Sequence, residues 1–200
     1  TASLQLARQG YEVHLIEKEK EPGGNLRESF YTLKGANPQD LLSKLVSQVE
    51  SNPSIHLYCE TKVLGFEKKN GHYQTKIRRR DEEKVIDHGA LILATGGKEV
   101  SPQEYLYGKD PRVLTQRQLE RMIHLNDTGL KDIHSLVMIQ CVGSRDENHP
   151  YCSRICCGHA VKNALRLKEK DPGMSIYVLY RDVRTYGFYE TYYHEAREKG

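Results

Sequence analysis

The chain has 200 residues, enough to bury one sizeable core or two small ones. Its 30 Lys and Arg nearly balance its 27 Asp and Glu, and a net charge of +3 indicates no nucleic-acid partner. No apolar run is long enough to span a bilayer, and no signal peptide opens the chain. We therefore expect no membrane span and a reducing, cytoplasmic setting, in which structural disulfides are rare.

The chain reads as a fragment of a longer protein. It opens on "TASLQLARQG", the body of a helix with no strand before it, and it stops at Gly200 directly after a helical pattern. A glycine in that place is typical of a helix end that leads into another element. We therefore expect further elements on both sides of the sequence.

The first 97 residues alternate between helix and strand patterns. "YEVHLIEKE" predicts an apolar strand that ends near Glu17, a helix is expected from about Pro38, and "SIHLYCE" predicts a second strand. "TKVLGFEKKNGHYQTKIRR" predicts a hairpin about Asn70-Gly71, and "GALILATGG" predicts a buried strand.

This order of elements suits a dinucleotide. An acidic residue at the end of the second strand of a doubly wound domain accepts hydrogen bonds from an adenosine ribose, and Glu17 has that place. The glycines of "PGGN" let the backbone pass close to a large cofactor. Taken alone, an acidic strand end is usually just solvated and a glycine pair is usually a plain turn. The set resembles the two-dinucleotide-binding-domain flavoproteins of the glutathione-reductase-like class, which bind FAD. The resemblance implies FAD contacts at Glu17, Gly23, Gly24, Asn25, Thr95 and Gly96, and at the backbone of Val63.

A second unit begins near residue 130. "SLVMIQ" predicts a buried strand, "CSRICCGHAVKNALRLKEK" a helix and "SIYVLYRDV" another strand, which together form a βαβ unit. Such a unit normally offers a glycine-rich turn to a nicotinamide pyrophosphate at the helix N-terminus. Here the turn, residues 141–145, has no Gly-x-Gly-x-x-Gly and is followed by cysteines. We interpret a cysteine-bound centre as the replacement for a second dinucleotide; the alternative is NAD bound by an irregular loop.

The predicted fold class is therefore α/β, a fragment of a two-dinucleotide-binding-domain flavoprotein with parallel sheets and a β-hairpin insertion. Residues 1–129 are expected to form a partial FAD-binding domain without its first strand and glycine-rich turn. Residues 130–200 are expected to form a partial second βαβ domain that carries the cysteines.

Four of the five cysteines lie within seventeen residues, in the pattern Cys141-x10-Cys152-x3-Cys156-Cys157. Structural zinc usually takes two Cys-x2-4-Cys knuckles or a histidine pair. A cubane iron–sulfur cluster presents four corners in different directions and suits thiolate ligands. The spacing also departs from the ferredoxin Cys-x2-Cys-x2-Cys run, so that spacing alone leaves zinc and iron–sulfur open.

The stretches "IQCVGSRDENHPYCSRICCGHAVKNAL", "GGNLRESFYTLKG", "ATGGKE" and "YRDVRTYGFYETYYHEAREKG" closely resemble the A-type subunit of heterodisulfide reductase. The resemblance implies an FAD-bearing subunit with one 4Fe-4S cluster, and a lysine near the flavin N5, which Lys162 matches. It implies other electron-transfer subunits as partners, ferredoxin-like, heterodisulfide reductase B- and C-like or hydrogenase subunits. The implied cluster ligands are Cys141, Cys152, Cys156 and Cys157.

We therefore predict an oxidoreductase subunit that passes electrons between FAD and the cluster, with flavin-based bifurcation as a family implication. One alternative is an NAD(P)H-dependent thiol/disulfide flavin oxidoreductase with the cysteines as redox thiols. Another is a zinc-stabilised binding module. Arg145 and Arg154 flank the cysteines, where guanidinium groups either stabilise a reduced cluster or form ordinary ion pairs.

Overall fold

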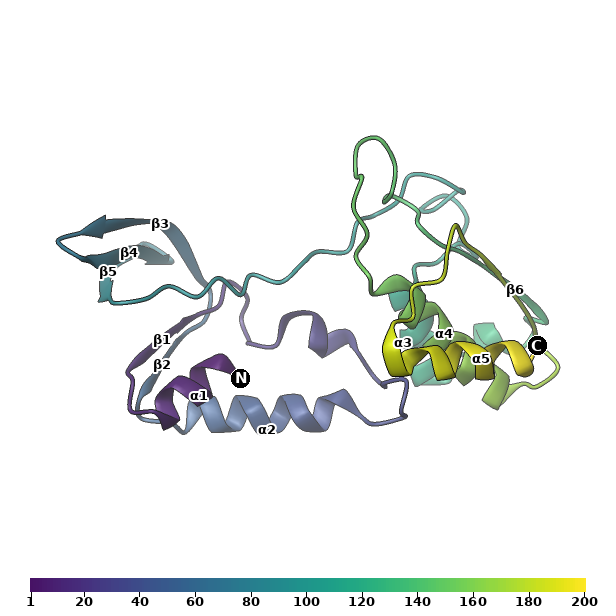
Figure 1. Cartoon of the computed structure of the whole chain (residues 1–200), viewed down its shortest axis with the longest axis horizontal. Helices are drawn as coiled ribbons and strands as arrows, with labels where there is room; N and C mark the ends of the chain where they lie inside the picture. Colours follow the sequence, from purple (N-terminus) through teal and green to yellow (C-terminus); the bar gives the residue numbers. More distant parts are fainter. The chain divides into compact units, whose positions relative to one another are not determined.

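The computed structural model describes residues 1–200, which form two compact units. Unit 1 comprises residues 1–27 and 39–97, and unit 2 comprises residues 28–38 and 98–200. Each unit has its own parallel strand pair and its own core (Figure 1). The predicted boundary at residue 129 concerns cofactor-binding domains and stays a prediction.

Unit 1 is built on two parallel strands, with Val13 opposite Ile55 and Ile16 opposite Tyr58. Helices cover one face of this pair and bury leucines and valines spaced three and four residues apart (Figure 1). The predicted strands and helix are confirmed. The elements are α1 (Ala2–Arg8), β1 (Val13–Ile16), the 3-10 turn η1 (Gly24–Glu28), α2 (Pro38–Glu50) and β2 (Ile55–Tyr58).

The hairpin extends into an antiparallel three-stranded sheet, β3 (Thr61–Lys69), β4 (His72–Arg79) and β5 (Glu82–His88). Asn70 and Gly71 turn between β3 and β4 with φ of 51° and 85°. Two positive φ values in a two-residue loop match the right-handed twist of the flanking strands. The predicted hairpin insertion is therefore confirmed.

The strand predicted from "GALILATGG" is wrong in this structure. Residues 90–97 form no regular element, and Leu91, Ile92 and Leu93 are exposed. A strand needs a neighbouring strand to pair its backbone N–H and C=O groups, and no strand of the structure pairs with residues 90–97. Apolar sequence alone therefore did not decide the conformation here.

Unit 2 contains the predicted βαβ unit, in which parallel strands pair Ser135 with Ser175 and Ile139 with Leu179. Its core gathers apolar residues from the helices, the strands and the segment at residues 28–38. The elements are α3 (Gln116–Leu125), η2 (Thr128–Leu130), β6 (Ser135–Ile139), α4 (Cys156–Lys170), β7 (Ser175–Leu179), η3 (Gly187–Tyr189) and α5 (Glu190–Glu198).

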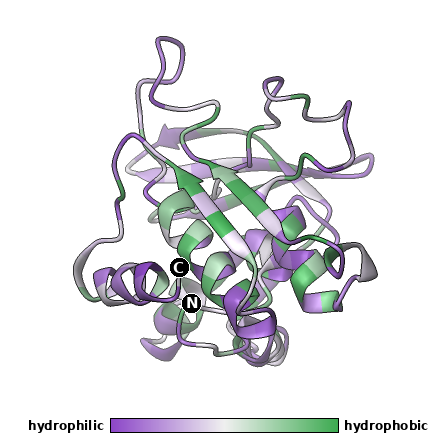
Figure 2. Ribbon diagram, turned by 90° about the vertical axis from the view of Figure 1, so that its right-hand side faces the viewer, coloured by the Kyte–Doolittle hydropathy of each residue, from purple (hydrophilic) through white to green (hydrophobic).

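Two details of unit 2 differ from expectation. The strand β6 is buried on one face only: Met138 packs in the core, whereas Val137 and Ile139 are exposed. Figure 2 shows the strand pair with hydrophobic residues along it. The helix α4 begins at Cys156, so that Cys152 lies in the preceding irregular segment.

Both parallel strand pairs and the hairpin insertion agree with the predicted α/β fold class. No helix of the chain combines the length and the apolar character needed to cross a membrane.

Candidate functional site

The cysteines follow the strand β6 along an irregular path, which we call the cysteine loop (residues 141–155). Three of its non-glycine residues have left-handed backbone, Cys141 at φ 62°, Arg145 at φ 59° and Arg154 at φ 60°. Such conformations are uncommon outside glycine, persist where the surroundings impose them and cluster at functional sites. The loop ends where α4 begins, so Cys156 and Cys157 occupy the first turn of that helix.

All five cysteines carry free thiols, and only Cys157 is buried. Burial raises the pKa of Cys157; the Arg184 main-chain N–H lowers it by hydrogen bonding to the sulfur, and the neighbouring Cys156 and Cys141 thiols raise it further. These three thiols therefore lie within interaction range of one another. The Sγ of Cys152 accepts a hydrogen bond from the Arg154 N–H at 3.4 Å.

The thiols do not converge on a single point. No three His, Cys, Asp or Glu side chains are placed to hold one metal ion. A tetrahedral zinc ion needs its four ligands around one centre, whereas a cubane cluster takes its thiolates at four separate corners. Four free thiols on one loop and helix start are soft donors of the type that iron–sulfur clusters take.

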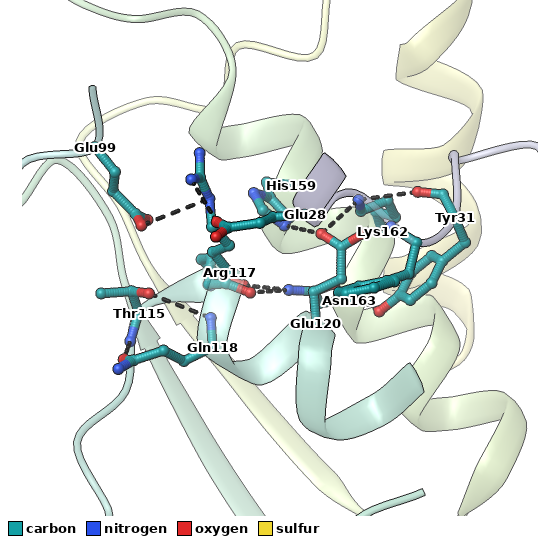
Figure 3. Close-up of polar contacts among 12 residues, drawn as sticks. Glu28, Tyr31, Glu99, Thr115, Arg117, Gln118, Glu120, His159, Lys162 and Asn163 are labelled. Carbon is teal, nitrogen blue, oxygen red and sulfur yellow. Dashed lines mark hydrogen bonds and ion pairs between the residues drawn. The ribbon is translucent and has the colours of Figure 1, made fainter. Parts of the chain in front are cut away.

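A second group of polar residues, which we call the Glu120 network, joins α3 to α4. Glu120, only 1% exposed, accepts hydrogen bonds from His159 Nε2 at 2.5 Å and from the Phe30 N–H at 2.8 Å, and Lys162 Nζ lies 2.8 Å from its carboxylate. Lys162 also donates to the Tyr31 carbonyl at 3.0 Å. Figure 3 shows His159 and Lys162 pointing from α4 at the Glu120 carboxylate on α3. A buried carboxylate with this set of donors is fully paired.

The charge state of the network follows from these contacts. Burial alone would raise the pKa of Glu120, but the hydrogen bonds from His159, Lys162 and Phe30 outweigh it and lower the pKa to about 2. Burial, together with the nearby Glu120 charge, raises the pKa of Tyr31. Glu120 is thus an anion at neutral pH, held in a protein interior by a cation and two further donors.

The network continues through neutral groups to the start of α3. The Tyr31 hydroxyl donates to Asn163 Oδ1 at 2.8 Å, and Asn163 is fully buried. Asn163 Nδ2 in turn donates to the Gln116 carbonyl oxygen at 2.9 Å. Lys162, predicted at the flavin, is therefore not a solvated helix lysine; its side chain is 11% exposed and its ammonium has fixed partners.

The residues predicted to bind FAD lie in unit 1. Glu17 follows β1, its Oε1 accepts from the Glu19 N–H at 2.9 Å, and its carbonyl accepts from Thr61 at the start of β3. Val63, two residues into the same strand, is exposed. The structure thus brings Glu17 close to the strand that carries Val63.

The glycine pair and the Thr95-Gly96 segment also meet. Asn25 Nδ2 donates to the Gly97 carbonyl oxygen at 2.8 Å, which joins the two predicted cofactor segments within unit 1. Gly24, Thr95 and Gly96 are exposed there, and an open surface on which two such segments meet fits a long dinucleotide.

The backbone conformation and the packing around Gly23 both require glycine. Its φ is 128°, and a Cβ at this position would lie 2.8 Å from Leu42 Cδ1 and 3.2 Å from Arg27 Cγ. Such backbone and such close packing exclude most other side chains with or without a cofactor. Gly23 therefore adds less weight to the FAD prediction than Asn25 does.

Sequence reasoning missed the partners of the predicted residues. Glu120, His159 and Asn163 were not singled out, although Glu120 sits between Leu119 and Ile123 on the apolar side of α3, an unusual place for a carboxylate. That signal could have been read from the helical spacing of residues 116–125. Asp182 and Arg184, which lie against the cysteines, carry no such local signal.

Known proteins resemble this chain in both sequence and fold. Residues 1–139 match the family model "Pyridine nucleotide-disulphide oxidoreductase". Among curated proteins, the chain is 40% identical over 148 residues to the CoB--CoM heterodisulfide reductase iron-sulfur A subunit of Methanocaldococcus jannaschii, a match that covers 66% of this chain and 22% of the relative. It is also 40% identical over 138 residues to the A subunit of the H(2)/formate:CoB-CoM heterodisulfide,ferredoxin reductase of Methanococcus maripaludis, covering 60% of this chain and 21% of that protein.

Among solved structures, the L-proline dehydrogenase from P. horikoshii matches 93% of this chain and 34% of its own, with a TM-score of 0.51 and 18% sequence identity. This likeness concerns the fold and agrees with the predicted class. The chain spans about a fifth of the length of the curated relatives it matches. The resemblance predicted from the cysteine motif and its flanking stretches is confirmed.

Proposed function

Because the chain belongs to the pyridine nucleotide-disulphide oxidoreductase family, we propose that it is the flavin- and cluster-binding part of an electron-transfer subunit like the A-type subunit of heterodisulfide reductase. The observation that carries the proposal is the set of four free thiols on the loop after β6 and in the first turn of α4. In a dinucleotide-binding βαβ unit this turn would carry glycines against a pyrophosphate. Here it offers thiolate ligands instead.

The chemistry divides between the two groups. FAD, when bound, would accept electrons in pairs and release them singly, and a 4Fe-4S cluster would accept one electron at a time. In the proposal, Cys141, Cys152, Cys156 and Cys157 hold the cluster through their sulfurs. The protein thereby keeps a one-electron acceptor at a fixed place.

The flavin is held by this chain's own residues in the same proposal. Glu17 would accept hydrogen bonds from the adenosine ribose, and Val63 would meet the adenine through its backbone. Lys162 would donate a hydrogen bond to the flavin at N5, with the Glu120 carboxylate and the Tyr31 carbonyl fixing the ammonium in place. The remaining proposed contacts are Gly23, Gly24, Asn25, Thr95 and Gly96.

The central step is tested on the 200-residue chain reconstituted without oxygen with iron, sulfide and FAD. Light-driven reduction of the flavin is followed by its absorbance, and cluster reduction by electron paramagnetic resonance. We expect the cluster signal to appear after flavin reduction in the wild type, and Cys156→Ser to show flavin reduction without it. A wild-type flavin that reduces while a fully assembled cluster stays oxidised would contradict the proposal.

The FAD site has its own test. Glu17→Gln removes the charge that would accept from the ribose, and a hydrogen bond to a charged group contributes about 1.5 to 3 kcal/mol. We expect FAD to dissociate at least tenfold more readily, as measured by titration of flavin fluorescence. Glu19→Gln, at a nearby exposed carboxylate, is the control and should bind like the wild type. Equal affinity of Glu17→Gln and wild type would remove Glu17 from the site.

The partners and the bifurcating step are further parts of the proposal. The named relatives are subunits of heterodisulfide reductases, so we propose that this chain works with ferredoxin-like, heterodisulfide reductase B- and C-like or hydrogenase subunits, in the cytoplasm. Free thiols at all five cysteines fit a reducing compartment. If the intact complex reduces one acceptor at full rate while the other is omitted, the flavin does not bifurcate electrons.

A thiol/disulfide oxidoreductase driven by NAD(P)H is the second candidate. The family is named for pyridine nucleotide-disulphide oxidoreductases, which favours this function. The hydrogen bond between the Cys156 and Cys157 side chains also favours it, because it brings two thiols together. A disulfide in the resting protein, together with bleaching of the flavin by NAD(P)H, would support this function. Persistent free thiols and no response to NAD(P)H would remove it.

A further inference from the structure

The segment after β7, residues 180–185, lies against the cysteines, and we call it the β7 loop. The β6–β7 ladder continues one residue beyond β6, through a hydrogen bond from the Gln140 N–H to the carbonyl of Leu179, the last residue of β7, at 2.8 Å. This pairing brings Cys141 alongside the start of the β7 loop. The two segments are far apart in sequence but adjacent in the sheet.

The main chain of the β7 loop contacts the buried thiol. Cys157 Sγ lies 3.9 Å from the Asp182 carbonyl oxygen, and the Arg184 N–H donates to the same sulfur. Hydrogen bonds from main-chain N–H groups to ligand sulfurs are one of the ways in which a protein raises the reduction potential of an iron–sulfur cluster. The loop therefore acts on at least one proposed ligand directly.

Two arginines that pair with the Asp182 carboxylate of this loop lie near two more of the thiols. Arg145 pairs with the Asp182 carboxylate and hydrogen-bonds the Cys141 thiol. Arg184 Nη2 lies 3.1 Å from Asp182 Oδ2, and its guanidinium interacts electrostatically with Cys152. One carboxylate thus holds two guanidinium groups in the neighbourhood of the cysteines.

We propose that Arg145, Asp182 and Arg184 form a positioning set that raises the reduction potential of the cluster held by the four cysteines; this inference rests on the proposed function. Reduction adds one negative charge to a site that already carries four thiolates. Two fixed cations beside the sulfurs stabilise that added charge, and Asp182 holds them while leaving one net positive charge. Asp182 and Arg184 lie outside the cysteine motif.

Arg154 has a different place, although it is adjacent in sequence to the cysteines. Its main-chain N–H donates to Cys152 Sγ, and its backbone is left-handed. No carboxylate pairs with its guanidinium within salt-bridge distance, in contrast to Arg145 and Arg184. The structure therefore assigns the tuning role to Arg145 and Arg184.

The test measures the midpoint potential of the reconstituted cluster by redox titration followed with electron paramagnetic resonance. At the potential where half of the wild-type clusters are reduced, Arg184→Gln should lower the ratio of reduced to oxidised cluster about tenfold, equivalent to 59 mV for one electron. Arg184→Lys keeps the charge and should recover most of the ratio. Arg145→Gln should shift it in the same direction.

Arg166→Gln is the matched control, because it removes the same charge from the middle of α4, where Arg166 pairs with Glu169. A wild-type midpoint in both Arg145→Gln and Arg184→Gln, with iron content unchanged, would overturn the inference and leave the proposed function standing. A shift of the same size in Arg166→Gln would overturn it too, because net charge alone would then explain the effect. A wild-type chain that takes up no iron would overturn the proposed function itself.

Discussion

Helix α4 carries two sites of opposite character, one turn apart. In the Glu120 network, His159 and Lys162 of α4 both pair with the Glu120 carboxylate. The cysteine loop and the first turn of α4 hold thiols whose contacts are weak or long, at 3.4 Å and 3.9 Å where a distance is defined. The charges of the first site are paired with one another, whereas the thiols of the second have only long hydrogen bonds.

This difference predicts which substitutions should lower stability and which should lower binding. A buried charge that loses its partner leaves the interior with an uncompensated ion, so changes in the Glu120 network should lower stability. A thiol that serves as a ligand contributes little to the stability of the fold before its metal or cluster binds. Changes at the cysteines should therefore lower binding much more than stability.

The largest expected effect is that of Glu120→Gln. The substitution keeps the shape of the side chain but leaves the Lys162 ammonium without its anion in a site where the carboxylate is 1% exposed. Removing one partner of a buried ion pair destabilises a protein by about 3 to 5 kcal/mol. Urea unfolding followed by circular dichroism should show a loss in this range.

Glu195→Gln provides the control for this prediction, since it breaks the exposed Lys199–Glu195 pair at 2.7 Å on α5. Exposed pairs contribute about 0 to 1 kcal/mol. If Glu120→Gln and Glu195→Gln lower the unfolding free energy equally, the Glu120 network is not a closed, stabilising site.

The next effect is the response of stability to acid. The pKa of Glu120 falls from an ordinary value of 4.5 to about 2 in the folded chain, a difference that corresponds to roughly 3 kcal/mol. Because the folded-state pKa is depressed, this stabilisation is present above pH 4.5 and is lost as the pH falls from about 4.5 toward 2.

Unfolding free energies of the wild type and Glu120→Gln should therefore converge over that acidic range. The measurement is a series of urea titrations between about pH 6 and pH 3, with the two chains compared at each step. If the wild type instead exceeds Glu120→Gln in unfolding free energy by the same amount at every pH, the pKa of Glu120 is not lowered by folding.

The smallest effect on stability is expected at Cys156. Its thiol is partly exposed in the first turn of α4, and Ser is nearly the same size. A surface substitution of this kind changes the unfolding free energy of the metal-free chain by about 0.5 kcal/mol or less. A loss as large as that of Glu120→Gln would mean that the cysteines, too, serve mainly to hold the fold.

The sequence allowed the local parts of the fold to be predicted. The apolar spacing in α2, the strands β1 and β2, the Asn70-Gly71 turn and the βαβ unit are periodic or short-range signals, and each is present in the structure. The strand predicted from residues 90–97 failed because a strand also needs a partner beside it, which its own residues do not specify.

The candidate site divides in the same way. Cys141, Cys152, Cys156 and Cys157 are recognisable because their spacing is local. The Glu120 carboxylate reaches His159 and Lys162 about forty positions away, and Arg145 reaches Asp182 across 37 positions. Contacts of this length are created by the packing of α3 on α4 and by the β6–β7 ladder, so that only the three-dimensional structure reveals them.

The most direct test of the central claim is the content of iron and acid-labile sulfide in the 200-residue chain reconstituted without oxygen. The four cysteines at residues 141–157 and Cys59 are its only thiols, so the count reports on this motif alone. We predict about four iron and about four sulfide ions per chain, lost in Cys156→Ser and retained in Cys59→Ser. Zinc in place of iron, or four reactive thiols without metal, would contradict the cluster and leave thiol chemistry as the function of these residues.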